Sequence, residues 1–262
     1  MKADTPLTGT FLHAAVPRIL VTGATQGIGL STAQLFASKG WHVVLHGRDA
    51  KKLKTAASSM HGAATVRTLN FDVRDRKAVG KALKGLEVDV LVNNAGLARG
   101  LEPLQEGEPE GWDETLDVNV KGLLYVTRAL LPGMVQRGSG HVVNLGSTAG
   151  HWVYKGGGVY CASKFAVRAL TEALRLDVHG SGVRVTSVDP GIVGGTNFSV
   201  VRFGGDRERA KKVYEGLEAL TPQDIAETIL WVVERPARVN IQEVILTPTA
   251  QASVRDVHRV PT

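Results

Sequence analysis

The chain alternates between short apolar runs and longer segments in which apolar residues recur at helical spacing. Residues 88–92 are apolar along nearly their whole length, which is typical of a strand buried on both faces of a parallel sheet. The alternation predicts an α/β fold, a Rossmann-type doubly wound parallel β-sheet with helices on both faces. The predicted strands are 18–21, 41–46, 66–71, 88–93, 141–145, 183–188 and 241–246, and the predicted helices are 28–39, a segment from about 49, about 115–137, about 160–178, and 222–234.

The pattern shows no interior linker, so the 262 residues are predicted to form a single domain over residues 17–262. Residues 1–16 read as an N-terminal extension that ends before Pro17. Two stretches rich in Gly, 99–111 and 190–206, are predicted to be loops. The second is long enough to act as a mobile lid over a site.

Composition narrows the classes of function. The formal charge of +6 comes from basic residues mixed with acids, which disfavours a nucleic-acid-binding surface. A single cysteine, Cys161, excludes an internal disulfide and favours a reducing, cytoplasmic compartment. No apolar run reaches the length of a membrane span, and the eight histidines lack metal-ligand spacing. We therefore expect no membrane, nucleic-acid or metal partner.

A glycine-rich turn follows the first predicted strand. Residues 22–29 place Gly23 in the turn and Gly27 and Gly29 at the start of the first helix. Glycines at these places let the backbone approach a pyrophosphate at the helix N-terminus. The turn therefore predicts a dinucleotide site.

The end of the second strand indicates which dinucleotide binds. A site for NAD usually carries a carboxylate there for the ribose 2′-hydroxyl. This chain instead has Gly47 followed by Arg48, and an arginine suits a 2′-phosphate. Asp49 opposes that charge, while Lys51 and Lys52 offset it. The pattern favours NADP over NAD. Asp72 could accept from an adenine amino group or cap a helix.

Tyr160 and Lys164 lie four residues apart, so on a helix they share one face. A cation beside a phenol favours the phenolate and lowers its pKa from about 10. Ser147, thirteen residues earlier, could hold the reacting oxygen. The trio predicts proton transfer to or from an alcohol oxygen.

On these motifs the chain resembles the short-chain dehydrogenase/reductase family over residues 17–249. Within the family it is most similar to the NADP-dependent 3-hydroxy acid dehydrogenases, including serine and allo-threonine dehydrogenases. That closer resemblance is carried by residues 131–134, 144–150, 193–199, 201–203 and 219–222. The family motifs are 22–29, 93–96, Asn119, Ser147, Tyr160 with Lys164, and Pro190 with Gly191.

The resemblance implies a role for each matching residue. Tyr160 would be the general acid/base, with Lys164 lowering its pKa and binding the nicotinamide ribose. Ser147 would hold the substrate oxygen, and Asn119 would complete a proton relay. The residues implied to border the cofactor are Gly23, Thr25, Gln26, Gly27, Ile28, Gly29, Arg48, Asp72, Val73, Asn94, Ala95, Gly96, Tyr160, Lys164, Pro190, Gly191, Ile192, Val193 and Thr196.

A 3-hydroxy acid also needs its carboxylate recognised. The candidate cations are Arg202, Lys155 and Arg99, of which Arg202 lies in the predicted lid. The substrate site is therefore predicted to contain Ser147, Tyr160 and Arg202. Two alternatives stay open: a reductase of 3-oxoacyl thioesters or general ketones, and a cofactor-sensing protein without activity. Surplus apolar residues on helices 115–137 and 160–178 predict contacts with other copies of the chain. The resemblance implies a homotetramer through these helices, and a dimer would also bury them.

Overall fold

A computed structural model describes residues 16–260, so all but the last residue of the predicted N-terminal extension lies outside the described residues. Seven parallel strands form one sheet in the order β3-β2-β1-β4-β5-β6-β7. The predicted fold class is confirmed, and each predicted strand is present to within two residues at either end. The strands are β1 (Arg18–Val21), β2 (His42–Gly47), β3 (Thr65–Asn70), β4 (Val90–Asn93), β5 (Gly140–Leu145), β6 (Val183–Pro190) and β7 (Glu243–Leu246).

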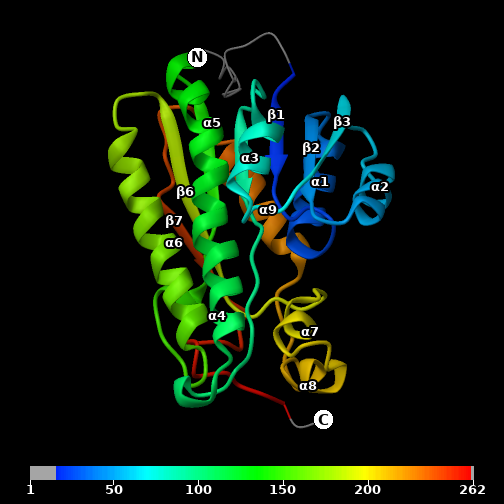
Figure 1. The fold of residues 1–262 in the computed structure, drawn as a ribbon, viewed down its shortest axis with the longest axis vertical. Coiled ribbons are helices and arrows are strands. Elements are labelled where there is room, and N and C mark those ends of the chain that lie inside the picture. The colour runs from blue at the N-terminus through cyan, green and yellow to red at the C-terminus, as the bar shows by residue number, and fades with distance from the viewer. Residues whose placement is uncertain (1–15, 261–262) are drawn as a thin grey trace, which may run out of the picture.

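Helices cover both faces of the sheet (Figure 1). One apolar core joins the sheet to α1, α2 and α9, with Phe36 and Ile229 fully buried in it. A second core joins the other face to α3 and α5, where Met134 is fully buried. The helices are α1 (Gly27–Ser38), α2 (Ala50–Ser58), α3 (Arg76–Leu83), α4 (Pro109–Leu116), α5 (Leu123–Arg137), α6 (Gly158–Asp177), α7 (Phe198–Arg202), α8 (Arg207–Lys212) and α9 (Pro222–Val233).

Three predictions about helices were wrong in detail. The single helix expected over 115–137 is α4, a π-helical turn at Asp117–Gly122, and then α5. The expected loop 190–206 contains α7, and the expected loop 99–111 contains a 3₁₀ turn at Leu104–Glu106 and the start of α4. Helix α3 was not predicted, although Asp75 caps it by accepting from the backbone of Lys77 and Ala78.

The strand order places a site at one edge of the sheet. It reverses between β1 and β4, and in doubly wound sheets ligands bind beyond the carboxyl ends of the strands at such a point. Helices α7 and α8 lie beyond that same end of the sheet, near α4 (Figure 1). Among residues 16–260, no helix has the length and apolar character needed to cross a membrane.

Candidate active site

The glycine-rich turn is held open for a ligand. Gly23 and Gly27 have φ values of 65° and 55°, which side chains rarely adopt. A Cβ at Gly29 would collide with the Asn94 amide and the Gly23 carbonyl. The Asn94 amide itself donates to the carbonyls of Thr22 and Gly23 at 2.8 and 3.2 Å. The Asn94 side chain therefore ties the turn to the segment that follows β4.

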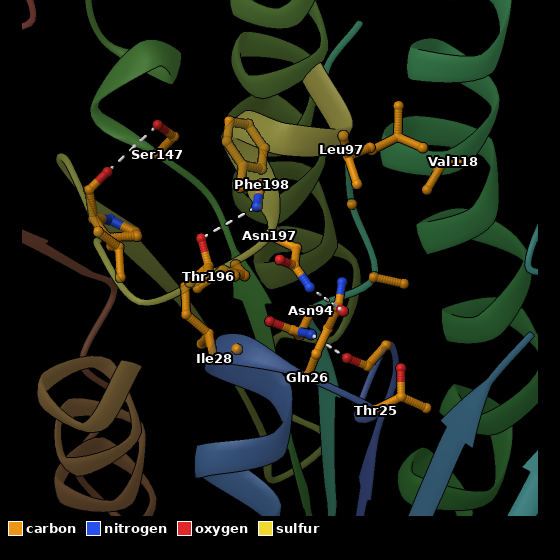
Figure 2. A pocket seen from close by; sticks show the side chains of 18 of the residues that line it. Thr25, Gln26, Ile28, Asn94, Leu97, Val118, Ser147, Thr196, Asn197 and Phe198 are labelled. Carbon is orange, nitrogen blue, oxygen red and sulfur yellow. Dashed lines mark hydrogen bonds between the residues drawn. The ribbon is translucent and has the colours of Figure 1, made fainter. Parts of the chain in front are cut away.

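Helix α1 begins without a capping side chain. Its N-cap, Gln26, makes no side-chain hydrogen bond to the first turn. Its amide oxygen instead accepts a 3.0 Å bond from Asn197, the residue before α7 (Figure 2). The first amides of α1 therefore have no side-chain acceptor at the N-cap, which is the arrangement that binds phosphate oxygens.

A cleft of about 300 Å³ runs from this turn to Tyr160. Its volume lies within the range of small-molecule sites. Several lining residues were not among the predicted site residues, because contacts between neighbouring strand ends and turns are not visible in a motif; these are His46, Gly47, Leu97, Val118, Leu145 and Gly146. Asn197, Phe198 and Val201 also line the cleft and lie within residues 190–206, the predicted lid. The predicted residues that line it are Gly23, Thr25, Gln26, Gly27, Ile28, Arg48, Val73, Asn94, Ala95, Gly96, Ser147, Tyr160, Lys164, Pro190, Gly191, Val193 and Thr196.

Five predicted site residues lie outside the lining set, namely Gly29, Asp72, Asn119, Ile192 and Arg202. Gly29 supports the turn from behind, as described above. The Ile192 backbone is engaged elsewhere: its amide donates to Gln251 Oε1 at 2.8 Å and its carbonyl accepts from Leu220. Ile192 is thus turned toward the C-terminal segment.

Asn119 lies in the π-helical turn and is buried. Its Oδ1 accepts from the Leu97 amide at 2.9 Å, and its Nδ2 donates to the Leu97 carbonyl and to Ser163 Oγ at 2.8 and 3.0 Å. These bonds fix the segment that follows β4 against α6.

Ser147 lies directly after β5 and caps the 3₁₀ turn Thr148–Gly150. Its Oγ accepts from the Ala149 amide at 3.1 Å and donates to the Pro190 carbonyl at 3.4 Å (Figure 2). The hydroxyl therefore links the ends of β5 and β6 at the cleft.

Tyr160 and Lys164 lie on the first turns of α6, as predicted, and both face the cleft. The expected lowering of the Tyr160 pKa was wrong. Burial raises the pKa of the phenol, with Ser147 and Arg202 opposing that rise. The Lys164 ammonium donates to the Leu145 carbonyl at 2.8 Å and lies 5.9 Å from the centre of the Tyr160 ring. Burial lowers the pKa of Lys164 to about 8, against the charge of Asp189.

The acids near Arg48 have structural partners. Asp49 is the N-cap of α2 and accepts from the Lys51 and Lys52 amides at 2.9 and 3.1 Å. Asp75 rather than Asp72 caps α3, and the expected contact of Asp72 with the adenine stays a prediction. The Asp72 carboxylate is held by Arg74, and Arg48 lies 3.6 Å from it. The pKa of Asp72 is lowered because the Arg74 hydrogen bonds outweigh the opposing effect of burial.

Among the three candidate cations, the surroundings distinguish Arg202. Lys155 is exposed, and Arg99 is paired with Glu114 at 2.7 Å. Arg202 Nε donates to the Gly100 carbonyl and Nη1 to the Tyr154 hydroxyl, each at 2.8 Å. Its guanidinium lies 5.7 Å from the centre of the Tyr160 ring. Its Nη2 is buried and has no hydrogen-bond partner within residues 16–260.

A buried contact between a histidine and a carboxylate, which the sequence did not predict, lies next to the Ser147 turn. His151 Nε2 lies 3.0 Å from Asp189 Oδ2, and Ser187 Oγ donates to Asp189 Oδ1 at 2.6 Å. Glu243 approaches His151 at 3.5 Å and is paired with Arg168. Asp189 Oδ1 occupies the space that a side chain at residue 146 would need. The pair joins the turn after β5 to the end of β6.

Comparison with known proteins shows the family. The short chain dehydrogenase family matches residues 17–203. The chain is 48% identical over 247 residues to the NADP-dependent 3-hydroxy acid dehydrogenase YdfG of Salmonella typhi, covering 92% of this chain and 99% of that protein. It is 43% identical to serine 3-dehydrogenase of Rhizobium radiobacter, covering 89% and 94% of the two chains.

A solved structure agrees. The closed form of a serine dehydrogenase complexed with NADP⁺ superposes with a TM-score of 0.88 at 44% identity, covering 93% of this chain and all of that one. The chain therefore belongs to the short-chain dehydrogenase family.

Proposed function

We propose that this protein is an oxidoreductase that transfers hydride between NADP(H) and the hydroxyl or carbonyl carbon of a short 3-hydroxy acid, such as serine, allo-threonine or 3-hydroxypropionate. The similar proteins include an NADP-dependent 3-hydroxy acid dehydrogenase and serine dehydrogenases, and this supports the proposed cofactor and substrate class. Arg202 is the residue that supports a substrate with a carboxylate. Its buried Nη2 has no partner within residues 16–260, and its guanidinium lies near the Tyr160 ring. A substrate carboxylate would satisfy it.

The residues of the cleft fit a dinucleotide. The glycine turn and the uncapped start of α1 suit the pyrophosphate, and Arg48 is half-exposed at the end of β2, where the 2′-phosphate would lie. When bound, the nicotinamide ring supplies the acceptor or donor of the hydride. We propose that residues 17–262 form the domain that carries this site.

Each catalytic residue has a proposed task. Ser147 Oγ donates to the substrate oxygen, and the Tyr160 hydroxyl gives it a proton during reduction or takes one during oxidation. Because burial raises the pKa of Tyr160, the phenol is protonated near neutral pH and ready to act as the acid. Lys164 supplies a positive charge behind it, and Asn119 fixes the segment through which a proton relay would run.

The pH dependence should differ between the two directions. Oxidation requires the Tyr160 phenolate, and since the pKa of that phenol is raised, the reactive fraction is small at neutral pH. The initial rate of oxidation should therefore rise steeply from pH 6 to about pH 8. It should bend above that, because the pKa of Lys164, lowered to about 8, marks the loss of its charge. Reduction should stay flat over pH 6–8. Rate profiles in both directions check this, and a flat oxidation profile would contradict it.

The substrate class is tested by reduced-nicotinamide formation from NADP⁺ or NAD⁺ with L-serine, D-serine, L-allo-threonine and 3-hydroxypropionate, using neutral secondary alcohols as controls. We expect turnover of the acids with NADP⁺ and little with the alcohols. Activity only on neutral compounds would favour the ketone or 3-oxoacyl-thioester reductase. Tight cofactor binding without any turnover would favour a sensor.

We also propose a cytoplasmic homotetramer. The lone cysteine, Cys161, is buried and unpaired, which suits a reducing compartment. Apolar side chains are exposed on α5 and α6, among them Leu124, Val135, Phe165 and Leu176. Burial of these faces against other copies would remove that apolar surface from water.

The oligomeric state is checked by light scattering after size-exclusion chromatography. The wild-type protein should elute at the mass of four chains. Changing Phe165 and Leu176 together to glutamate should lower that mass, because charges would be buried at the interface. A wild-type monomer would contradict the proposal. A wild-type dimer would replace the proposed tetramer by a single interface between two copies.

A further inference from the structure

Two arginines that follow adjacent strands lie close together beside the part of the cleft that Arg48 lines. Arg48 follows β2, and Arg74 follows β3. Arg48 Nη1 lies 3.6 Å from Asp72 Oδ2 and 3.8 Å from Glu114 Oε1. Arg74 reaches the same two oxygens, with Nη2 at 2.7 Å from Asp72 Oδ2 and Nη1 at 3.9 Å from Glu114 Oε1. The two guanidinium groups therefore face one shared region.

Asp72 holds only one side of the Arg74 guanidinium. Its carboxylate accepts from the Arg74 backbone amide at 2.9 Å, and from Nε and Nη2 at 2.7–3.1 Å. These bonds fix the plane of the guanidinium and leave Nη1 directed toward Glu114. At 3.9 Å that contact is longer than a hydrogen bond. Arg74 is therefore rigidly placed and still has a donor edge available.

Glu114 is the close partner of a third arginine. Its Oε2 accepts from Arg99 Nε at 2.7 Å, and Arg99 also donates to the Val201 carbonyl of α7. Hydrogen bonds to Arg99 lower the pKa of Glu114, which keeps it charged. Arg48 has only the longer contacts to the two acids and is 50% exposed. Arg48 is the most loosely held of the three.

The charges do not balance in this cluster. Three arginines, 48, 74 and 99, share two carboxylates, those of Asp72 and Glu114. Asp49, next to Arg48, is turned to the start of α2 by its capping bonds. A phosphate monoester carries close to two negative charges near neutral pH and three acceptor oxygens, so one half-exposed arginine satisfies it poorly. Two guanidinium groups on adjacent strand ends satisfy it well.

We propose that Arg74 is a second cation for the 2′-phosphate of NADP(H), and that Arg48 and Arg74 together form a clamp on that group. Asp72 then holds Arg74 in place. The inference rests on the proposed NADP-binding function and adds a residue to it. In this arrangement the second positive charge comes from the β3 side of the site, away from Asp49, which follows Arg48.

The clamp is tested on the full-length protein with two probes that lack the nicotinamide, 2′,5′-ADP and 5′-AMP. They differ only in the 2′-phosphate, so calorimetric titration of both isolates its contribution. The wild-type protein should bind 2′,5′-ADP more tightly. Arg74→Ala should weaken 2′,5′-ADP binding about tenfold or more and leave 5′-AMP binding within about twofold, since a charge-assisted contact to phosphate is lost. Arg48→Ala should behave likewise.

Matched variants separate a local effect from a general one. Arg76→Ala removes an equal charge from the exposed first residue of α3, two positions away, and should change neither affinity. Asp72→Asn should weaken 2′,5′-ADP binding less than Arg74→Ala does, because Arg74 stays but is held less firmly. Unchanged 5′-AMP binding also reports that each variant is folded.

The failure of this inference is distinguishable from failure of the proposed function. If Arg48→Ala loses affinity for 2′,5′-ADP and Arg74→Ala does not, the clamp is wrong and the NADP site stands. An equal loss of 2′,5′-ADP affinity in Arg76→Ala would mean that the affinity depends only on the overall positive charge of this region, which would overturn the clamp. If the wild-type protein binds both probes equally, both the clamp and the proposed preference for NADP are wrong.

Discussion

Replacing Tyr160 by phenylalanine should lower kcat by about a thousandfold or more, because the variant lacks the hydroxyl that we propose exchanges a proton with the substrate oxygen. The ring stays, and with it the contact to Phe198 at a centroid distance of 5.5 Å. NADPH affinity should therefore change little. The measurement is the steady-state rate in both directions together with a fluorescence titration of NADPH.

Tyr125→Phe is the matched control for this experiment. It removes the same hydroxyl from a partly buried tyrosine on α5, and its rate should equal that of the wild-type protein. Turnover by the Tyr160 variant comparable to that of the control would remove Tyr160 from the mechanism. A collapse of NADPH binding would show instead that the hydroxyl organises the cofactor site.

The second large effect is expected at Arg202. Arg202→Ala should reduce kcat/KM for 3-hydroxy acids by about a hundredfold, since hydrogen bonds to a charged group contribute roughly 1.5–3 kcal/mol each. Neutral secondary alcohols should lose no more than about threefold, because they place no charge near this guanidinium. The comparison of the two substrate classes within one variant measures recognition of the carboxylate.

Arg202 also holds structure, so its test needs controls. Removing it leaves the Gly100 carbonyl and the Tyr154 hydroxyl without their 2.8 Å partner. Arg207→Ala, an exposed arginine at the start of α8, should leave both substrate classes unchanged. Equal losses for acids and alcohols in the Arg202 variant would mean that the residue only supports α7, and the carboxylate would have to bind elsewhere.

The sequence pattern predicted the fold well where burial controls it. The central strands β1 and β4 are short, buried and largely apolar because the sheet is covered on both faces there, whereas the edge strand β3 is mostly exposed. All seven strands were predicted to within two residues at either end. Helix α3 escaped detection because its eight residues include three basic ones and a glycine, and only Val79 and Leu83 are buried. The break between α4 and α5 has no Gly or Pro signal at its start, since a π turn keeps helical spacing nearly intact.

The candidate site could be predicted where the spacing of residues along one helix or strand decides which side chains lie together. Tyr160 and Lys164 share a helix face, and Ser147 ends a strand at the same edge. The predicted lowering of the Tyr160 pKa was wrong, because spacing along α6 does not show that the phenol is buried, and burial raises its pKa. The partners of Arg202 could not be read from the chain either. Gly100 lies 102 positions away and Tyr154 lies 48 away, on separate segments.

The close approach of Asp189 to Gly146 has a consequence for anyone who varies this enzyme by directed evolution. Residue 146 has no room for a methyl group while residue 189 is an aspartate bonded to His151. The two positions lie 43 residues apart in the chain, and the residues allowed at one therefore depend on the residue at the other. Libraries that randomise the pocket wall at 146 alone will return only glycine, whereas libraries that vary 146 and 189 jointly give access to new shapes next to Ser147.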